Sequence, residues 1–267
     1  MRPELFHISG APVHSYTVMM ALALFMTVYL GARECEKRGV PLTPVAGLIV
    51  FAAGYLGARV FHVVQFEGWS RILHAFKFWQ SGLVFHGGLT AGVIAFLVYL
   101  LIKRISLLDA LDIAAPYAAL GEAIGRVGCL LNGCCWGSAT SVPWAVTYRP
   151  GTYPFESQVN LGDIALSAHQ SLPVHPTQIY MAAALLLIFV VLKRSLNWKA
   201  FAGVSILLYA MLQGVLRLLV ESYRGDVTVA YWGLTSGQLV SVGLILLAFV
   251  ALPIAYLKRR ERWSADL

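Results

Sequence analysis

Long apolar segments alternate with short polar ones along the whole chain. A helix that crosses a bilayer needs about 20 predominantly apolar residues. Seven segments reach or approach that length, at residues 16–32, 42–64, 83–102, 108–131, 177–192, 201–221 and 234–257. The pattern predicts an all-α polytopic membrane protein with seven transmembrane helices. Because the fourth segment is the most polar, we expect it to be buried inside the helix bundle.

Two connections between these segments carry patterns of their own. In residues 66–80 large apolar side chains recur every three or four positions, which is typical of an amphipathic helix lying in the membrane interface. These side chains are Trp69, Ile72, Leu73, Phe76 and Trp79. The longest connection, residues 132–176, is rich in proline and includes an extended-looking stretch at 144–148. We expect it to form a small extracytoplasmic cap between helices four and five, within a single integral-membrane domain over residues 1–267.

Composition supports the membrane assignment. Hydrophobic residues make up 58% of the chain and charged residues only 12%, with a mean hydropathy of +0.71. A soluble domain carries roughly 25% charged residues. The net charge of +7 therefore indicates basic loops facing anionic lipid, and no nucleic-acid partner is expected.

The basic residues also predict an orientation. Twelve Lys and Arg residues fall in loops on the side that holds the C-terminus, and five fall on the other side. Cytoplasmic loops carry the excess of Lys and Arg. We therefore expect the C-terminus in the cytoplasm and the N-terminus outside.

The stretch 121–137 places polar groups at the end of an apolar segment. Glu122, Arg126 and Asn132 lie there, and an ionisable group at membrane depth indicates a functional site by default. Four small or polar positions share one helical face, Gly121, Gly125, Gly128 and Asn132. Small residues let a neighbouring helix approach closely. The alternative is that Glu122 and Arg126, four residues apart, only neutralise each other.

Polar residues from six segments converge on the same outer level of the predicted bundle. They include three intramembrane arginines, Arg59, Arg126 and Arg217, around His86. The guanidinium fork matches phosphate oxygens and stays charged when it is desolvated, so the predicted ligand is a phospholipid. Each residue also has a purely structural reading, in which Arg59 reaches to the interface, Tyr16 belongs to an aromatic belt, and Gln213 joins helices.

These residues also carry a resemblance. The stretch 125–137, Gly-Arg-Val-Gly-Cys-Leu-Leu-Asn-Gly-Cys-Cys-Trp-Gly, looks like the signature of bacterial prolipoprotein diacylglyceryl transferases. Similar elements occur in order along the chain, at Tyr16, 57–59, 86–89, 175–180, 217–224 and 237–238. The family moves the diacylglyceryl group of phosphatidylglycerol onto the lipobox cysteine of exported preprolipoproteins and releases glycerol phosphate. The resemblance therefore implies a multi-pass enzyme of the bacterial plasma (inner) membrane.

Residue roles follow from the resemblance. It implies that Arg126 and Arg217 hold the phosphate and that His86 is a candidate base. Other matched residues are expected to contact substrate: Tyr16, Arg59, Gly87, Gly88, Asn132, Gly137, His175, Gln178, Tyr180, Glu221 and Arg224. The partners would be phosphatidylglycerol, the lipobox cysteine and the bilayer, with no cofactor.

Three positions depart from the family pattern. Cys129 stands where an Asn is usual, Cys134 where an acidic residue is usual, and Met181 where a Glu is common. The alternative function is therefore a paralogue of the same fold, acting either as a different phospholipid-dependent transferase or as a non-enzymatic lipid transporter. A thiol oxidoreductase is disfavoured because the chain has neither a Cys-x-x-Cys pair nor a quinone motif.

The cysteines of this stretch have several possible roles. Cys129 and Cys134 can form a disulfide only if the helix ends between them, because Cα atoms more than about 7 Å apart cannot be bridged. The alternatives are small buried thiols, a covalent role, and a zinc site with a histidine. We expect a bridge or a packing role rather than a covalent one, because the implied reaction takes its nucleophilic thiol from the acceptor protein. We expect no metal, because the chemistry does not demand one.

Overall fold

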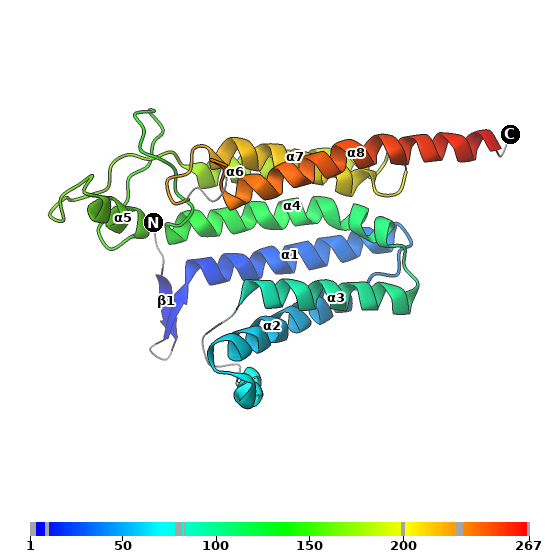
Figure 1. Ribbon diagram of the computed structural model, residues 1–267, viewed down its shortest axis with the longest axis horizontal. Coiled ribbons are helices and arrows are strands. Elements are labelled where there is room, and N and C mark those ends of the chain that lie inside the picture. Colours follow the sequence, from blue (N-terminus) through cyan, green and yellow to red (C-terminus); the bar gives the residue numbers. More distant parts are fainter. Residues whose placement is uncertain are drawn as a thin grey trace. The chain divides into compact units, whose positions relative to one another are not determined.

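The computed structural model describes residues 4–8, 11–77, 82, 84–198, 201–227 and 232–265. Long helices lie at each position where the sequence predicts one (Figure 1). They are α1 (Ser15–Lys37), α2 (Pro44–Phe66), α3 (Phe85–Lys103), α4 (Leu107–Asn132), α6 (Thr177–Ser195), α7 (Val204–Glu221) and α8 (Ser236–Ala265). The chain is thus mostly helical, as the apolar pattern predicts.

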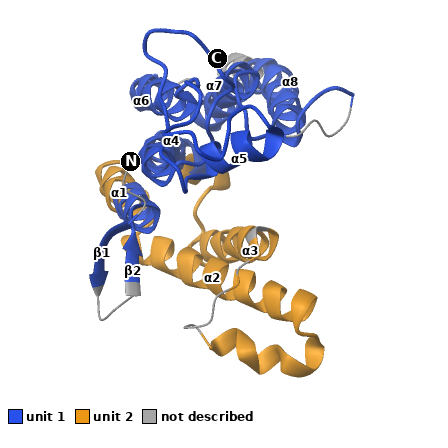
Figure 2. Cartoon of the chain, turned by 90° about the vertical axis from the view of Figure 1, so that its left-hand side faces the viewer, with its two compact units in different colours: residues 1–27, 111–267 blue, residues 28–110 orange. Residues whose placement is uncertain are grey.

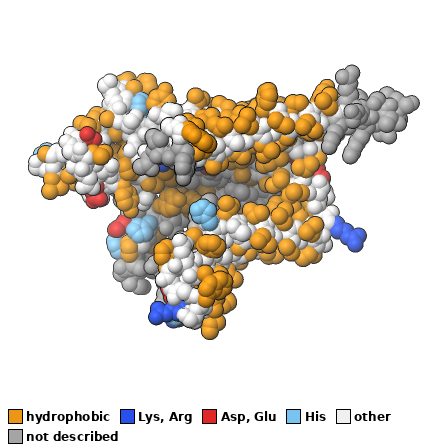
Figure 3. Space-filling model, viewed as in Figure 1, with side chains coloured by type: hydrophobic (Ala, Val, Ile, Leu, Met, Phe, Trp, Pro, Cys, Tyr) orange, Lys and Arg blue, Asp and Glu red, His pale blue; other side chains and the backbone are white. Residues whose placement is uncertain are grey.

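Six of these helices are long and apolar enough to cross a membrane. The helix that does not meet this description is α4, whose sequence includes Asp109, Asp112, Glu122 and Arg126. Large hydrophobic side chains lie exposed along the long helices (Figure 3), among them Leu101 at 77% and Phe249 at 71% exposure. Such surfaces are stable in lipid rather than in water, so the chain is a multi-pass membrane protein.

The described chain is mostly helical, and a short hairpin that the sequence pattern did not predict precedes the first helix. Strand β1 (Glu4–Ile8) pairs antiparallel with β2 (Ala11–His14), and α1 begins at the next residue. Phe6 pairs with Val13, and His7 with Pro12. The hydropathy pattern gives no sign of the hairpin, because its strands are far shorter than the roughly 20 apolar residues of a membrane span.

Each of the two patterned connections contains a short helix. A 3-10 helix, η1 (Trp69–Phe76), occupies the place of the predicted amphipathic helix, whereas Trp79 lies outside the described residues. Within residues 132–176, helix α5 spans Tyr153–Leu161. The extended-looking stretch pairs there through Val146, which forms a bridge with Val174.

The chain divides into two compact units, residues 1–27 with 111–267, and residues 28–110 (Figure 2). We call them unit 1 and unit 2. In unit 1, alanines of α4 pack against Met181, Leu185 and Ile188 of α6 and against Val220 of α7. In unit 2, α2 and α3 approach so closely that a side chain at Gly57 would meet Ala91 and the carbonyl of Gly87. A single domain over residues 1–267 stays a prediction.

Candidate active site

The glycine face of α4 does what the sequence predicts, because α1 packs directly against it. A Cβ on Gly121 would collide with Thr27, and a Cβ on Gly128 would lie 2.9 Å from the Cβ of Met19. Tyr16 packs over the same glycine, 3.5 Å from the position of that Cβ. Small residues therefore bring the start of α1, with Tyr16, against the last turns of α4, which ends at Asn132.

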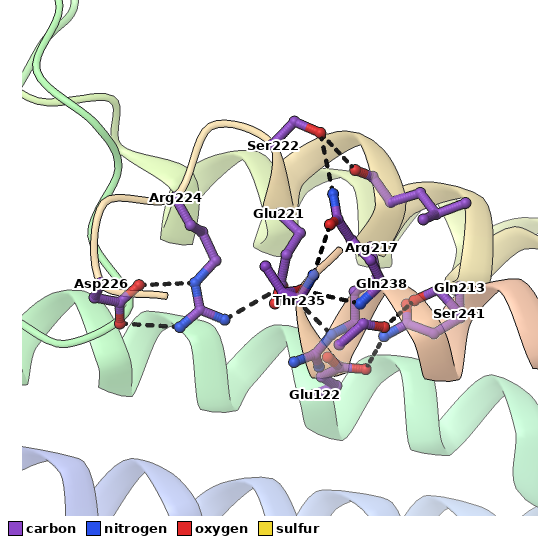
Figure 4. Close-up of polar contacts among 12 residues, drawn as sticks. Glu122, Gln213, Arg217, Glu221, Ser222, Arg224, Asp226, Thr235, Gln238 and Ser241 are labelled. Carbon is purple, nitrogen blue, oxygen red and sulfur yellow. Dashed lines mark hydrogen bonds and ion pairs between the residues drawn. The ribbon is translucent and has the colours of Figure 1, made fainter. Parts of the chain in front are cut away.

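Glu122 and Arg126 form an ion pair in the structure, but the pair engages only part of the guanidinium group. An Nη2 atom of Arg126 donates to Oε1 of Glu122 over 2.9 Å. The other carboxylate oxygen accepts a hydrogen bond from Nε2 of Gln213 at 2.7 Å (Figure 4). It also accepts one from the Tyr209 hydroxyl at 3.4 Å. The Nε atom of Arg126 is buried and has no hydrogen-bond partner among the described residues. Glu122 is thus well satisfied, whereas Arg126 keeps a donor for another acceptor.

A second polar cluster lies at the end of α7. The Glu221 side chain is only 4% exposed, and its Oε2 lies 3.5 Å from Nε of Arg217 and 3.4 Å from Nη1 of Arg224. Its Oε1 accepts a hydrogen bond from the Thr235 hydroxyl at 3.0 Å. Arg217 Nε makes no hydrogen bond within the described part of the chain, although it is buried. Glu221 therefore holds two arginines without saturating their donors.

Arg224 is also oriented by a carboxylate that the sequence patterns did not single out. Its Nε and Nη2 donate to the two oxygens of Asp226 over 2.8 and 2.9 Å (Figure 4). A bidentate pair fixes the plane of the guanidinium. Asp226 lies only two residues beyond Arg224 and outside the helix, so helical spacing gave no signal for it.

The motif at 125–137 is joined to the end of α7 by backbone pairing. Gly137 forms an antiparallel bridge with Arg224, and Ser138 N donates to the Tyr223 carbonyl over 2.7 Å. A Cβ on Gly137 would lie 2.9 Å from that carbonyl and closer still to His175. Only glycine fits there, which explains why a predicted site residue has no side chain.

The element at 175–180 supports the turn that follows α4. Thr177 Oγ1 donates to the Cys135 carbonyl over 2.7 Å, and Gln178 Nε2 donates to the Cys134 carbonyl over 2.8 Å. The Tyr180 hydroxyl accepts from Trp144 Nε1 at 2.7 Å and lies 3.2 Å from His175 Nδ1. These residues position the cysteine turn, and their predicted contacts with substrate stay predictions.

One pocket of unit 1 brings several of these residues together. It is lined by Arg126, Cys135, Thr177, Gln178, Met181, Arg217, Val220, Glu221 and Arg224. Its free volume is only about 10 Å³, on the scale of one water molecule. Three arginines line the pocket, and each is paired with a carboxylate, that of Glu122, Glu221 or Asp226. An anion would have to displace some of these contacts to enter.

Three cysteines cluster beside this pocket. The sulfur atoms of Cys129, Cys134 and Cys135 all lie within 4.8 Å of one another, and all are free thiols. The helix does end between Cys129 and Cys134, as a bridge requires, but in the structure no bridge joins them. Hydrogen bonds from the thiols of Cys129 and Cys135 hold the pKa of Cys134 well below its usual range.

The remaining predicted site residues belong to unit 2. Arg59 is fully buried, and its Nη1 donates to the Gly82 carbonyl over 3.1 Å and its Nη2 to the His74 carbonyl over 3.5 Å. His86 lies in the first turn of α3 with an exposed side chain. Gly87 and Gly88 pack against the α2 backbone at Gly57 and Gly54. The role of His86 as a base stays a prediction.

Comparison with known proteins adds a family. A family model described as prolipoprotein diacylglyceryl transferase matches residues 3–254. A phosphatidylglycerol–prolipoprotein diacylglyceryl transferase of Methylococcus capsulatus is 32% identical over 92% of this chain and 92% of its own length. Proteins of the same name from Clostridium tetani and Pasteurella multocida are 28% and 29% identical, over 92% and 97% of this chain and 95% of each relative.

Proposed function

The chain belongs to the prolipoprotein diacylglyceryl transferase family, and we propose that it transfers the diacylglyceryl group of phosphatidylglycerol to the lipobox cysteine of exported prolipoproteins. This is the first step of lipoprotein maturation. The acceptor sulfur attacks the glycerol carbon that bears the phosphate ester, and the carbon–oxygen bond breaks. A thioether forms, and glycerol phosphate leaves with the bonding electron pair.

The observation that carries this proposal is the arginine pocket of unit 1. Arg126, Arg217 and Arg224 line it together. The Nε atoms of Arg126 and Arg217 are buried and make no hydrogen bond within the described residues, although Arg217 Nε lies 3.5 Å from Glu221 Oε2. As the ester bond breaks, the phosphate gains a second negative charge. Preoriented guanidinium groups in a water-poor site stabilise that charge as it develops.

His86 is the proposed base that removes the acceptor thiol's proton. A free thiol has a pKa near ~8.5 and is a weak nucleophile until it is deprotonated. An imidazole titrates close to neutral pH and suits the task. This assignment rests on the family motif at 86–89.

We propose that α4 is the seventh transmembrane helix. Its 26 residues span about 39 Å at a rise of ~1.5 Å per residue, enough to cross the hydrocarbon core. The charged groups of its unit 1 part have partners. Asp112 accepts hydrogen bonds from the backbone of Gly203 at 2.7 Å and of Ile206 at 2.9 Å, and Glu122 pairs with Arg126.

An odd number of spans puts the two termini on opposite sides of the membrane. The basic excess then places the C-terminus in the cytoplasm, with the N-terminus and the cap at 132–176 outside. Reporter fusions after Lys199 and after Pro154 test this arrangement, and we expect them to report opposite compartments. Two fusions on the same side would contradict seven spans.

Turnover tests the function directly. The purified chain is mixed with phosphatidylglycerol and a lipobox peptide, and we expect a diacylglyceryl thioether on the peptide with release of glycerol phosphate. A peptide with Ser in place of the lipobox cysteine is the matched control. If labelled lipid crosses reconstituted vesicles but no thioether forms, the chain is a lipid transporter of the same fold.

A further inference from the structure

The cysteine cluster has the geometry of a metal site. A tetrahedral zinc ion with Zn–S bonds of about 2.3 Å holds its sulfur ligands about 3.8 Å apart. The sulfur atoms of Cys129, Cys134 and Cys135 already lie within 4.8 Å of one another. Side-chain rotations that move each sulfur by about 1 Å or less would complete three of the four bonds.

The backbone holds these sulfurs in place without any metal. The Cys129 carbonyl accepts hydrogen bonds from the amides of Gly133 at 2.9 Å and Cys134 at 3.1 Å, which turn the chain back on the end of α4. Thr177 and Gln178 anchor the carbonyls of Cys135 and Cys134 from α6. Cys135 has a φ of 59°, a left-handed conformation that few residues other than glycine adopt. A preformed turn with a strained cysteine is a feature of ligand sites.

We propose that Cys129, Cys134 and Cys135 bind a zinc ion whose fourth coordination position takes the acceptor thiol. No other His, Cys, Asp or Glu in the described part of the chain brings a ligand atom into this cluster. Three protein ligands with one open position are the arrangement of catalytic zinc sites, whereas structural sites are closed by four. Cys135 lines the arginine pocket, so the ion would lie at the wall of the proposed lipid site.

This inference rests on the proposed function and adds a step to it. The three cysteines would hold zinc, and the acceptor thiol would give its proton to the proposed base as its sulfur binds the metal as a thiolate. That sulfur attacks the diacylglyceryl carbon, the carbon–oxygen bond breaks, and glycerol phosphate leaves. A free thiol is only about 3% thiolate at pH 7, so zinc can raise the reactive fraction up to roughly 30-fold. Neither oxidation nor reduction is involved.

Charge also favours the ion. Three thiolates and Zn²⁺ carry a net charge of −1, and Arg126 and Arg224 line the same pocket as Cys135. The sequence alone disfavoured a metal because the family reaction requires none, and a bridge uses only two sulfurs. The third sulfur, held equally close, is the observation that reverses this preference.

Metal content is the first test. The full chain, purified in detergent through a tag without histidine, should contain stoichiometric zinc by plasma mass spectrometry. Cys129→Ser, Cys134→Ser and Cys135→Ser should each lose most of it. Cys35→Ser is the matched control, because Cys35 is a buried thiol of α1 outside the cluster, and it should keep the metal.

A spectroscopic test does not depend on how the variants fold. Cobalt exchanged into the wild-type chain should show thiolate-to-cobalt absorption, and a lipobox peptide with its cysteine should intensify that absorption. The peptide with Ser in place of cysteine should leave it unchanged. Wild-type protein without zinc or a cobalt–thiolate band, or with a mass two hydrogens lower from a disulfide, would overturn the site.

Turnover measurements distinguish zinc activation of the acceptor thiol from the proposed transferase function. Removing zinc with a chelator should lower turnover up to roughly 30-fold at pH 7, and added zinc should restore it. Full turnover after zinc removal, or a cobalt spectrum that ignores the cysteine peptide, would overturn acceptor activation while the transferase function stands. A metal site that responds to the peptide without any thioether product would instead support the site and overturn the transferase function.

Discussion

Arg59 in unit 2 and Arg126 in unit 1 are both arginines placed within long helices of a membrane protein, but they are satisfied differently. Arg59 donates to the main-chain carbonyls of Gly82 and His74. Arg126 donates instead to the carboxylate of Glu122. If Arg126 belongs to the proposed phosphate pocket and Arg59 only anchors the backbone, substitutions of Arg126 should act mainly on turnover and substitutions of Arg59 mainly on stability.

The largest expected effect comes from keeping the charge of the unit 1 arginines but changing their shape. Arg126→Lys and Arg217→Lys should each lower the rate by about 10²- to 10³-fold, because an ammonium cannot present a guanidinium fork to phosphate. Turnover per folded molecule with phosphatidylglycerol and a lipobox peptide measures this. Arg194→Lys, at an exposed position of α6, is the control. Near-normal rates in both variants would make these arginines structural.

Unit 2 should contribute to chemistry through His86. Replacing a general base costs about 10²-fold or more in rate, so His86→Gln should lower turnover by about that amount and change the shape of its pH profile. The profile is the decisive readout, because a residue that only packs changes yield without changing pH dependence. An unchanged profile would remove His86 from the proton-transfer step.

The helix pair of unit 2 should respond mainly in stability. Gly57→Ala places a methyl group against Ala91 and the Gly87 carbonyl, and overpacking of this kind costs about 1–3 kcal/mol. We expect a lower Tm in detergent with little change in turnover per folded molecule. Gly243→Ala is the matched control, because a Cβ at that position meets nothing within 4 Å. Equal Tm values for the two variants would contradict the close approach of α2 and α3.

Arg59→Lys should change turnover least and act on stability. A lysine ammonium can reach one of the two carbonyls but not both in the same geometry, and a hydrogen bond to a charged group contributes about 1.5–3 kcal/mol. We expect a lower Tm and an unchanged KM for lipid. A raised KM with an unchanged Tm would favour the substrate contact that the family motif implies for Arg59.

The sequence was most informative where one helix repeats one property. Apolar runs located the six helices of the described residues that are apolar enough to cross a membrane, and the glycine spacing of α4 identified the face that receives α1. The stripe of Arg217, Glu221 and Arg224 likewise forms one cluster. Each of these patterns is local, so spacing along one element was enough to predict it.

Features that depend on distant or irregular backbone were not predictable in this way. The bridge between Gly137 and Arg224 joins residues far apart in sequence, and Asp226 reaches Arg224 through a turn without helical spacing. The cysteine cluster forms because the chain folds back after Asn132, and a continued helix would have separated Cys129 from Cys134. Such contacts depend on tertiary structure that no periodicity encodes.

The position of Glu221 also bears on how glycerol phosphate would leave the pocket. The Glu221 carboxylate lies against Arg217 and Arg224, two arginines of the proposed phosphate pocket. If a lipid phosphate binds these arginines, it replaces Glu221 as their counter-ion. The affinity for lipid is then the difference between the arginine–phosphate and arginine–Glu221 interaction energies, not the full strength of either. The same carboxylate can return as glycerol phosphate departs. Because the Glu221 carboxylate can displace glycerol phosphate, a site basic enough to stabilise this leaving group can still release it.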